Sequence, residues 1–300
     1  RWRGKAFYQQ SFVPGMDTLK DLGANATWLS YNSPTWSFAW NHEYIGDNFT
    51  AEVGFVPRKG VFRLEPDVGY RFYGKKKINW HSPDLYADIF FDNNTWEALD
   101  WEFRARYKVV FKSSAELTFF YNNLFTKLTS PFDASRTGGE PLPIGEYHYD
   151  KVGFNFASNF RKPFRYSLKA NFGSYFNGTK LTYGGEIAYR LQPWGTFSLA
   201  FERNEIRLPQ PYSDGFLTLV GPKVELSFTQ SLFFTTFVQW NTQLDNLNIN
   251  SRFQWRFKPM SDLFIVYTDN YLPEVDFGEH FRFRQKNRTL VFKLVYWFNV

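Results

Sequence analysis

The sequence predicts an all-β chain that forms a transmembrane antiparallel β-barrel with about 16 strands, and further strands upstream of Arg1 are compatible with it. Three observations predict this fold: long segments alternate apolar and polar residues, these segments exceed ordinary strands in length, and tight turns alternate with longer loops. A soluble sandwich alternates as well, so strand length separates the two classes. A tilted membrane strand needs about 9 to 11 residues, whereas soluble strands average about five or six.

The composition excludes several other classes of protein. Phe, Trp and Tyr make up 22% of the chain, yet the mean hydropathy is negative, so apolar residues are interleaved with polar ones. No stretch approaches the roughly 18 apolar residues of a membrane helix. The chain has no cysteine for disulfides or cysteine-ligated metals. Lys and Arg are spread along the chain and form no basic stripe, so nucleic acid is not an expected partner.

Sixteen alternating segments are the predicted strands. In chain order they are Lys5–Val13, Ala24–Tyr31, Thr35–Tyr44, Val61–Tyr73, Ser82–Phe91, Leu99–Phe111, Ala115–Thr129, Tyr147–Phe160, Phe164–Phe176, Lys180–Leu191, Thr196–Arg207, Phe216–Thr229, Leu232–Gln243, Asn246–Phe257, Asp262–Tyr271 and Thr289–Val300. In Leu99–Phe111 the odd positions are apolar and the even positions from Asp100 to Lys108 are all charged. A period of two places the two sets on opposite faces of a strand, so we expect lipid on one side and an aqueous lumen on the other.

The connections between these segments alternate in kind. Every second one is a tight polar turn; these turns begin at Asn32, Gly74, Lys112, Arg161, Gln192, Thr229 and Lys258. The other set is more variable and includes the long loops Gly46–Gly60, Ser130–Glu146, Leu208–Gly215 and Leu272–Arg288. Outer-membrane barrels have short periplasmic turns and longer extracellular loops. This pattern predicts a bacterial outer-membrane location with the carboxyl terminus in the periplasm.

The last predicted strand ends on an apolar face that includes Tyr296, Phe298 and Val300. It resembles the C-terminal insertion signal of outer-membrane barrels, although Phe is commoner than Val at the final position. An ordinary final strand is the alternative interpretation. The signal would make the outer-membrane insertion machinery a partner of this chain, in addition to the lipid bilayer.

Three stretches carry a resemblance to a known family: Gly46–Leu64, Arg252–Tyr271 and Asn287–Val300. Together they resemble the barrel domain, of unknown function, of Gram-negative outer-membrane proteins that carry a carbohydrate-binding-like domain before the barrel. The resemblance implies that residues 1–300 form an outer-membrane barrel domain and that they are the C-terminal part of a longer chain. It implies location and architecture, and it supplies no catalytic residues.

Charged side chains on the polar faces are the candidate lumen residues. They are Asp84, Asp88, Glu102, Arg104, Arg106, Lys108, Arg252 and Arg256. If Ser82–Phe91 and Leu99–Phe111 form a hairpin around Asn94–Trp96, Asp84 lies opposite Lys108 and Asp88 lies opposite Arg104. Two interpretations stay open: weak ion pairs on a solvated wall, or desolvated pairs that help to close the lumen.

Two loops are candidates for a plug or gate. The loop Gly46–Gly60 offers Phe49, Phe55, Arg58 and Lys59 as a constriction, and Ser130–Glu146 is the second candidate. An exposed flexible loop is the alternative for each.

Nothing in the sequence indicates an enzyme, a cofactor or a metal site. The four histidines, His42, His81, His148 and His280, lack the close spacing of a zinc or nucleophile motif. We therefore predict a channel or transporter-like pore, and the resemblance suggests carbohydrate or another nutrient as cargo. The alternative is a structural or scaffold subunit of a larger outer-membrane complex, with a plugged barrel and with other outer-membrane or periplasmic proteins as partners.

Overall fold

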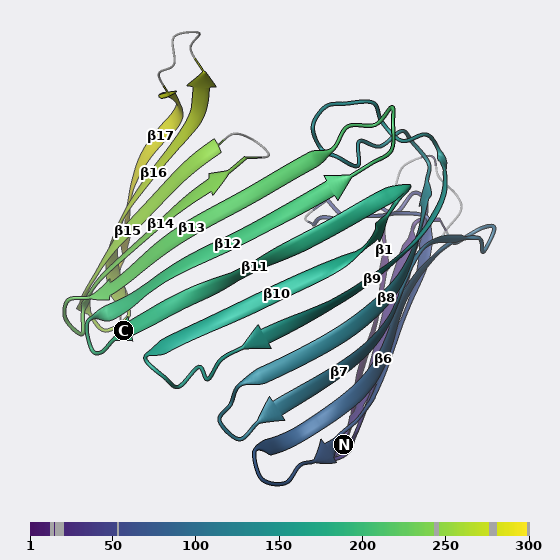
Figure 1. Ribbon diagram of the computed structural model, residues 1–300, viewed down its shortest axis with the longest axis horizontal. Helices are drawn as coiled ribbons and strands as arrows, with labels where there is room; N and C mark the ends of the chain where they lie inside the picture. The colour runs from purple at the N-terminus through teal and green to yellow at the C-terminus, as the bar shows by residue number, and fades with distance from the viewer. Residues whose placement is uncertain (13–14, 16–20, 53, 243–245, 276–280, 299–300) are drawn as a thin grey trace. The chain divides into compact units, whose positions relative to one another are not determined.

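The computed structural model describes residues 1–12, 15, 21–52, 54–242, 246–275 and 281–298. Seventeen strands belong to one antiparallel sheet, and neighbouring strands are joined by hairpin connections (Figure 1). Their bounds are β1 Trp2–Gln10, β2 Gly23–Asn32, β3 Trp36–Ile45, β4 Val61–Tyr70, β5 Phe72–Tyr73, β6 Ile78–Asp92, β7 Ala98–Phe111, β8 Glu116–Leu128, β9 Gly145–Ala157, β10 Phe164–Tyr175, β11 Gly178–Leu191, β12 Gly195–Arg207, β13 Gly215–Ser227, β14 Leu232–Asn241, β15 Asn246–Lys258, β16 Ser261–Val275 and β17 Phe281–Val295. In this described part of the chain, no helix is long and apolar enough to cross a membrane.

The chain divides into two compact units. The first comprises Arg1–Ala134, Glu140–Phe154 and Phe172–Thr179, and the second comprises Ser135–Gly139, Asn155–Asn171 and Lys180–Val300. In the first unit, β1 to β8 pair in chain order, with β4 and β5 both pairing with β6. In the second unit, β12 to β17 pair in chain order, and Figure 1 shows these strands side by side.

The prediction of an all-β antiparallel fold is confirmed, and each predicted strand has a counterpart. The segment Val61–Tyr73 forms two strands, β4 and β5, which are separated at Arg71. The backbone N–H of Arg71 donates to the carbonyl of Thr35 (2.6 Å), in the same register as the pairing of β3 with β4. The same register with β6 continues on both sides of this residue. The interruption accounts for seventeen strands where sixteen were expected.

The predicted tight turns lie between the strands, as expected, but one predicted long loop is wrong. Strand pairing continues through most of Leu272–Arg288, since β16 extends to Val275 and β17 begins at Phe281. A register shift between Asn270 and Tyr271 adjusts the ladder, which then continues to the pair Val275 and Phe281. The two strands thus pair well beyond the predicted length, and residues 276–280 between them lie outside the described part of the chain.

The end of β17 also differs from the prediction. The strand stops at Val295, so Tyr296 and Phe298 follow it in irregular backbone, and Val300 lies outside the described residues. Tyr296 is still anchored, because Lys258 Nζ donates to its hydroxyl (3.2 Å) and Phe257 stacks on its ring (6.3 Å between centroids).

Candidate functional site

On β6, β7 and β10 the apolar face is the more exposed face. On β6 and β7, Leu85 is 61% exposed and Phe103 is 44% exposed, whereas Asp84 on the opposite face is only 8% exposed. In the part of β10 that belongs to the second unit, the alternate residues Phe164, Tyr166 and Leu168 are exposed, and the polar residues between them are half-buried. A protein that folds around an apolar core shows the reverse arrangement.

A row of aromatic rings crosses the apolar face of the first unit near the tight turns. We call it the turn-side aromatic row; it consists of Trp2, Tyr31, Trp36, Phe38, Tyr70, Phe72, His81 and Tyr107. Neighbouring rings on adjacent strands contact one another, with centroids 4.8 Å apart for Trp36 and Tyr70 and 5.2 Å apart for Phe72 and His81. The Tyr107 hydroxyl lies 2.6 Å from His81 Nδ1. Rings with one polar edge suit the boundary between water and lipid.

A second row lies at the opposite ends of the same strands. This loop-side aromatic row consists of Phe62, Phe91, Trp96, Trp101, Phe125 and His148. Trp101 stacks on Phe125 at 4.2 Å, and Phe125 contacts His148 at 4.7 Å. Between the rows, the same face carries Leu29, Leu64, Pro66, Val68, Leu85, Ala87, Ile89, Phe103 and Ala105.

The separation of the two rows matches the thickness of a membrane. His81 and Phe91 lie ten residues apart on β6, which is about 33 Å along a strand that rises about 3.3 Å per residue. A strand tilt of about 40° reduces this length to about 25 Å, the height of the apolar band of outer-membrane barrels.

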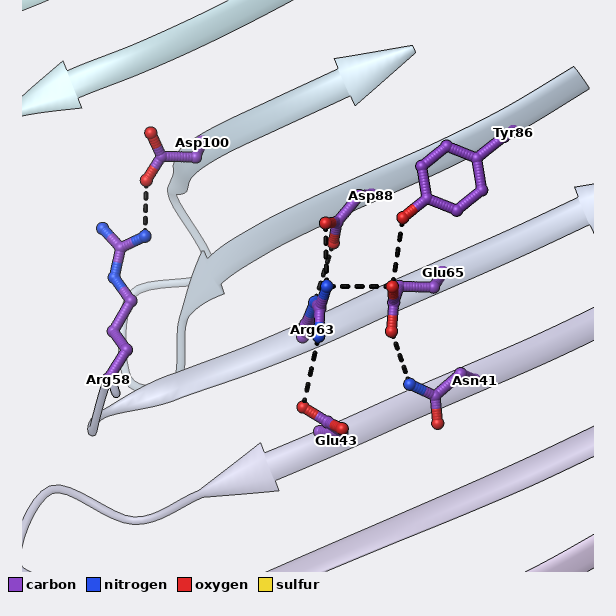
Figure 2. A network of polar contacts seen from close by, with 8 residues as sticks. All are labelled: Asn41, Glu43, Arg58, Arg63, Glu65, Tyr86, Asp88 and Asp100. Carbon is purple, nitrogen blue, oxygen red and sulfur yellow. Dashed lines mark hydrogen bonds and ion pairs between the residues drawn. The ribbon is translucent and has the colours of Figure 1, made fainter. Parts of the chain in front are cut away.

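The polar face of the first unit carries a network centred on Arg63. Figure 2 shows how the Arg63 guanidinium grips Asp88 with two hydrogen bonds, Nε to Oδ1 at 2.8 Å and Nη2 to Oδ2 at 2.9 Å. The same guanidinium contacts Glu65 at 2.9 Å and Glu43 at 3.6 Å. The Tyr86 hydroxyl also donates to Glu65 (3.1 Å). One cation therefore faces three carboxylates, contributed by β3, β4 and β6.

The two predicted ion pairs between β6 and β7 are wrong in register. Asp84 lies opposite Arg106 and bonds its Nε at 2.8 Å, whereas Asp88 lies opposite Glu102 and bonds Arg63 instead. The connection and a bulge between Phe90 and Phe91 shift the pairing by two residues from the predicted alignment. Strand side chains alternate with a period of two, so a shift of two residues gives each side chain a different cross-strand partner but leaves it on the same face of the sheet.

The remaining β7 charges find other partners on the same polar face. Lys108 Nζ pairs with Glu116 on β8 at 2.7 Å. Arg104 lies over the Tyr86 ring at 4.4 Å and is 3.9 Å from the carboxylate of Glu102.

Of the predicted constriction residues, Arg58 reaches the polar face beside the Arg63 network. It pairs with Asp100 (Figure 2), and its guanidinium lies 5.3 Å from the centre of the Phe90 ring. Phe49 is packed at the base of the loop with 5% exposure, whereas Phe55 is 88% exposed. Lys59 is exposed as well.

The second candidate loop is packed. Within the first unit, Phe132 and Leu142 exchange two backbone hydrogen bonds (3.0 and 2.8 Å), and Leu142 is fully buried. Within the second unit, the Ser135 backbone lies against Gly215, where a Cβ atom would be 2.4 Å from the Ser135 carbonyl oxygen. Local packing therefore orders both parts of Ser130–Glu146.

The two predicted lumen charges of the second unit lie on β15. Arg252 is exposed, and Arg256 pairs with Asp262 of β16 at 3.3 Å. Nearby strands carry simple pairs, of which Lys223 with Glu225 (2.7 Å) and Arg203 with Glu205 (3.0 Å) join residues two apart on one strand.

A cavity of about 660 Å³ opens on the polar face of the first unit, beside the Arg63 network. It extends from β1 to β6 and is walled by Lys5, Trp28, Glu43, Glu65, Asp67 and Tyr86. Sequence reasoning missed both this cavity and Arg63. The sequence did contain a signal for Arg63. The segment FRLEPD places the charged residues Arg63, Glu65 and Asp67 at alternate positions, which is the pattern of the charged residues on β7.

The described residues contain no group of three or more His, Cys, Asp or Glu side chains arranged to hold a metal ion. His280 lies outside the described residues.

Comparisons with known proteins return no relatives. No family model, no curated protein and no solved structure matches this chain. The resemblance based on the three sequence stretches therefore stays a prediction.

Proposed function

We propose that this chain forms a transmembrane β-barrel in a bacterial outer membrane and acts as a channel or transporter-like pore. The observation that carries the proposal is the pair of aromatic rows on an exposed apolar face, separated by about the height of a membrane's apolar band. In this proposal the apolar face contacts lipid. The opposite face, with Arg63, Arg104 and Arg106, lines an aqueous lumen.

Closure of the sheet into a barrel is part of the proposal. A closed barrel removes the unpaired strand edges that lipid cannot solvate. With about 16 strands, such a barrel is too wide for wall side chains to fill its interior. The tight turns would lie in the periplasm, together with the carboxyl terminus, and the outer-membrane insertion machinery would place the chain there. Carbohydrate or another nutrient is the cargo that the sequence resemblance favours.

A second candidate function is a scaffold subunit with a plugged barrel. The observation that favours it is Arg58, which extends from its loop onto the polar face to Asp100 and the Phe90 ring. In this alternative the loop and the ion pairs close the lumen, and other outer-membrane or periplasmic proteins are the partners.

Conductance of the purified protein in a planar lipid bilayer tests these proposals. We expect stable step-like currents, and we expect Arg58→Ala to increase the unit conductance if the loop narrows the passage. Phe55→Ala is the matched control in the same loop, since Phe55 makes few contacts and is 88% exposed. Silence of both the wild type and Arg58→Ala at all voltages would favour the scaffold. Recovery of the protein in a cytosolic fraction would contradict both.

A further inference from the structure

The cavity on the polar face has a floor of small side chains. Ala26 of β2 and Ala39 of β3 line it, while their neighbours carry rings or long polar chains. Cross-strand pairing places Trp28 beside Lys5 on one side and beside Asn41 on the other, and it places Asp67 beside Tyr86. The hollow thus exists because alanine methyl groups stand where a side chain of average size would fill the space. Its volume of about 660 Å³ is within the range of about 300 to 1,000 Å³ of small-molecule sites.

Negative charge dominates the walls. Four carboxylates, those of Glu43, Glu65, Asp67 and Asp88, lie in the cavity or on its Arg63 border, where the cations are Lys5 and Arg63. With Asp84, Arg104 and Arg106, which also act on Asp67, five acids against four cations leave a formal charge of −1, in a chain whose net charge is +6. This part of the polar face therefore differs in sign from the molecule as a whole.

One of these carboxylates has no partner of its own. Arg63 is engaged by Asp88, Glu65 and Glu43, and Glu65 also accepts from Tyr86. Among the described residues no hydrogen bond or ion pair within contact distance holds the Asp67 carboxylate, which lines the cavity, although the guanidinium groups of Arg106 and Arg104 act on it at longer range. A partly buried carboxylate without a partner is stabilised by a cation that enters beside it.

Aromatic rings complete the walls. Trp28 and Phe7 line the same cavity and offer it their π-systems, together with Tyr86, whose ring already carries the Arg104 guanidinium at 4.4 Å. A ring face attracts an organic cation, and the attraction strengthens where water is partly displaced. Rings and carboxylates together select a positively charged amine or guanidinium that also carries apolar groups.

We propose that this cavity is a binding site for organic cations, with Asp67 as the principal charge partner and Trp28 as the ring that contacts the apolar part of the ligand. The inference rests on the proposed function, because it treats the polar face as the wall of a lumen, and it names the class of solute that the lumen holds. Glu43 and Glu65 supply further acceptors on the wall.

Calorimetric titration of the purified protein in detergent micelles tests this site, with spermidine as the probe. We expect saturable binding that weakens at high salt, because ion pairing is screened. Asp67→Asn should weaken the affinity roughly tenfold, and Trp28→Leu roughly fivefold. Glu116→Gln is the matched control, since it removes a carboxylate outside the cavity, and it should leave the affinity unchanged.

A third variant distinguishes loss of the binding site from loss of the fold. Ala39→Leu fills the floor of the cavity without changing any charge, and it should abolish spermidine binding. The unheated variant should still migrate in a gel like the unheated, folded wild type. Equal weakening by Glu116→Gln and Asp67→Asn would overturn the site, because it would indicate a diffuse charge effect. Binding of glucose in place of spermidine would also overturn it, in favour of a neutral hydroxylated solute.

The binding test and the conductance test fail separately. A protein that conducts in a bilayer but binds no spermidine contradicts the site and leaves the channel standing. A protein that binds spermidine with the expected variant pattern but never conducts contradicts the channel and retains the site, within a plugged barrel.

Discussion

Arg63 of the first unit and Lys223 of the second unit show two ways in which a polar face holds its charges. In the first unit, Arg63 contacts three carboxylates from three strands, and its side chain is 25% exposed. In the second unit, Lys223 contacts one carboxylate two residues away on its own strand, and these side chains are 39% and 48% exposed. The first arrangement joins strands together, whereas the second joins residues that the backbone already holds close. The difference teaches that the number of ion pairs on the polar face of a sheet says less about its stability than which strands the pairs connect.

The largest effect on stability is expected at the centre of the first arrangement. Arg63→Met leaves three half-buried carboxylates without their shared cation, and we expect it to lower the free energy of unfolding by about 3 kcal/mol. Urea unfolding in detergent micelles, followed by tryptophan fluorescence, measures this loss. A loss no greater than that of Lys223→Met would abolish the contrast between the units.

A smaller effect is expected between β6 and β7. A double-mutant cycle with Asp84→Asn and Arg106→Met should give a coupling energy of about 1 kcal/mol, because Asp84 is buried but Arg106 is partly exposed. The matched cycle of Asp84→Asn with Lys108→Met should give a coupling near zero, since Lys108 pairs with Glu116. A coupling near zero for Asp84 with Arg106 and of about 1 kcal/mol for Asp84 with Lys108 would instead support the register that the sequence predicts.

Smaller again is the effect of a half-buried pair in the second unit. Arg203→Met removes the contact with Glu205 at 3.0 Å, and we expect a loss of about 0.7 kcal/mol, which the same urea unfolding measures. Both residues lie on β12, so the ladder between β12 and β13 keeps them in place without their pair. A loss of the size expected for Arg63→Met would show that pairs within one strand also organise the wall.

The smallest effect is expected for Lys223→Met. Its contact with Glu225 is exposed and screened, so the free energy of unfolding should change by less than about 0.5 kcal/mol. Raising the salt concentration in the unfolding experiment provides the control, since screening should bring the difference between the variant and the wild type still closer to zero.

Strand existence and the assignment of faces could be predicted, because both depend on a local period of two. Leu99–Phe111 illustrates this, since its charged and apolar sides lie on the predicted opposite faces. Partner identity could not be predicted, because a bulge at Phe90 and the length of a connection set the register between β6 and β7. The end of β16 was missed for a similar reason: pairing across a bulge extends a strand past the point where its pattern weakens.

The candidate site was less accessible to sequence reasoning than the fold. The charges of β7 were visible because five of them follow one another at alternate positions. The Arg63 network unites residues from 43 to 88 in the chain, and only the pairing of β3, β4 and β6 brings them together. The cavity depends on the small side chains of Ala26 and Ala39. Two alanines far apart in the sequence do not indicate that they line one cavity.

The Phe90 ring has a consequence for communication within the molecule. The guanidinium groups of Arg58 and Arg63 both lie against this ring, at 5.3 and 4.9 Å from its centre. Arg58 belongs to the loop between β3 and β4, and Arg63 belongs to the wall. One ring thus offers a physical contact through which the loop and the wall can be coupled. If a ligand that draws Arg58 away altered the free energy of the Arg63 network, reciprocity would require a cation bound at that network to alter the position of Arg58 to the same extent.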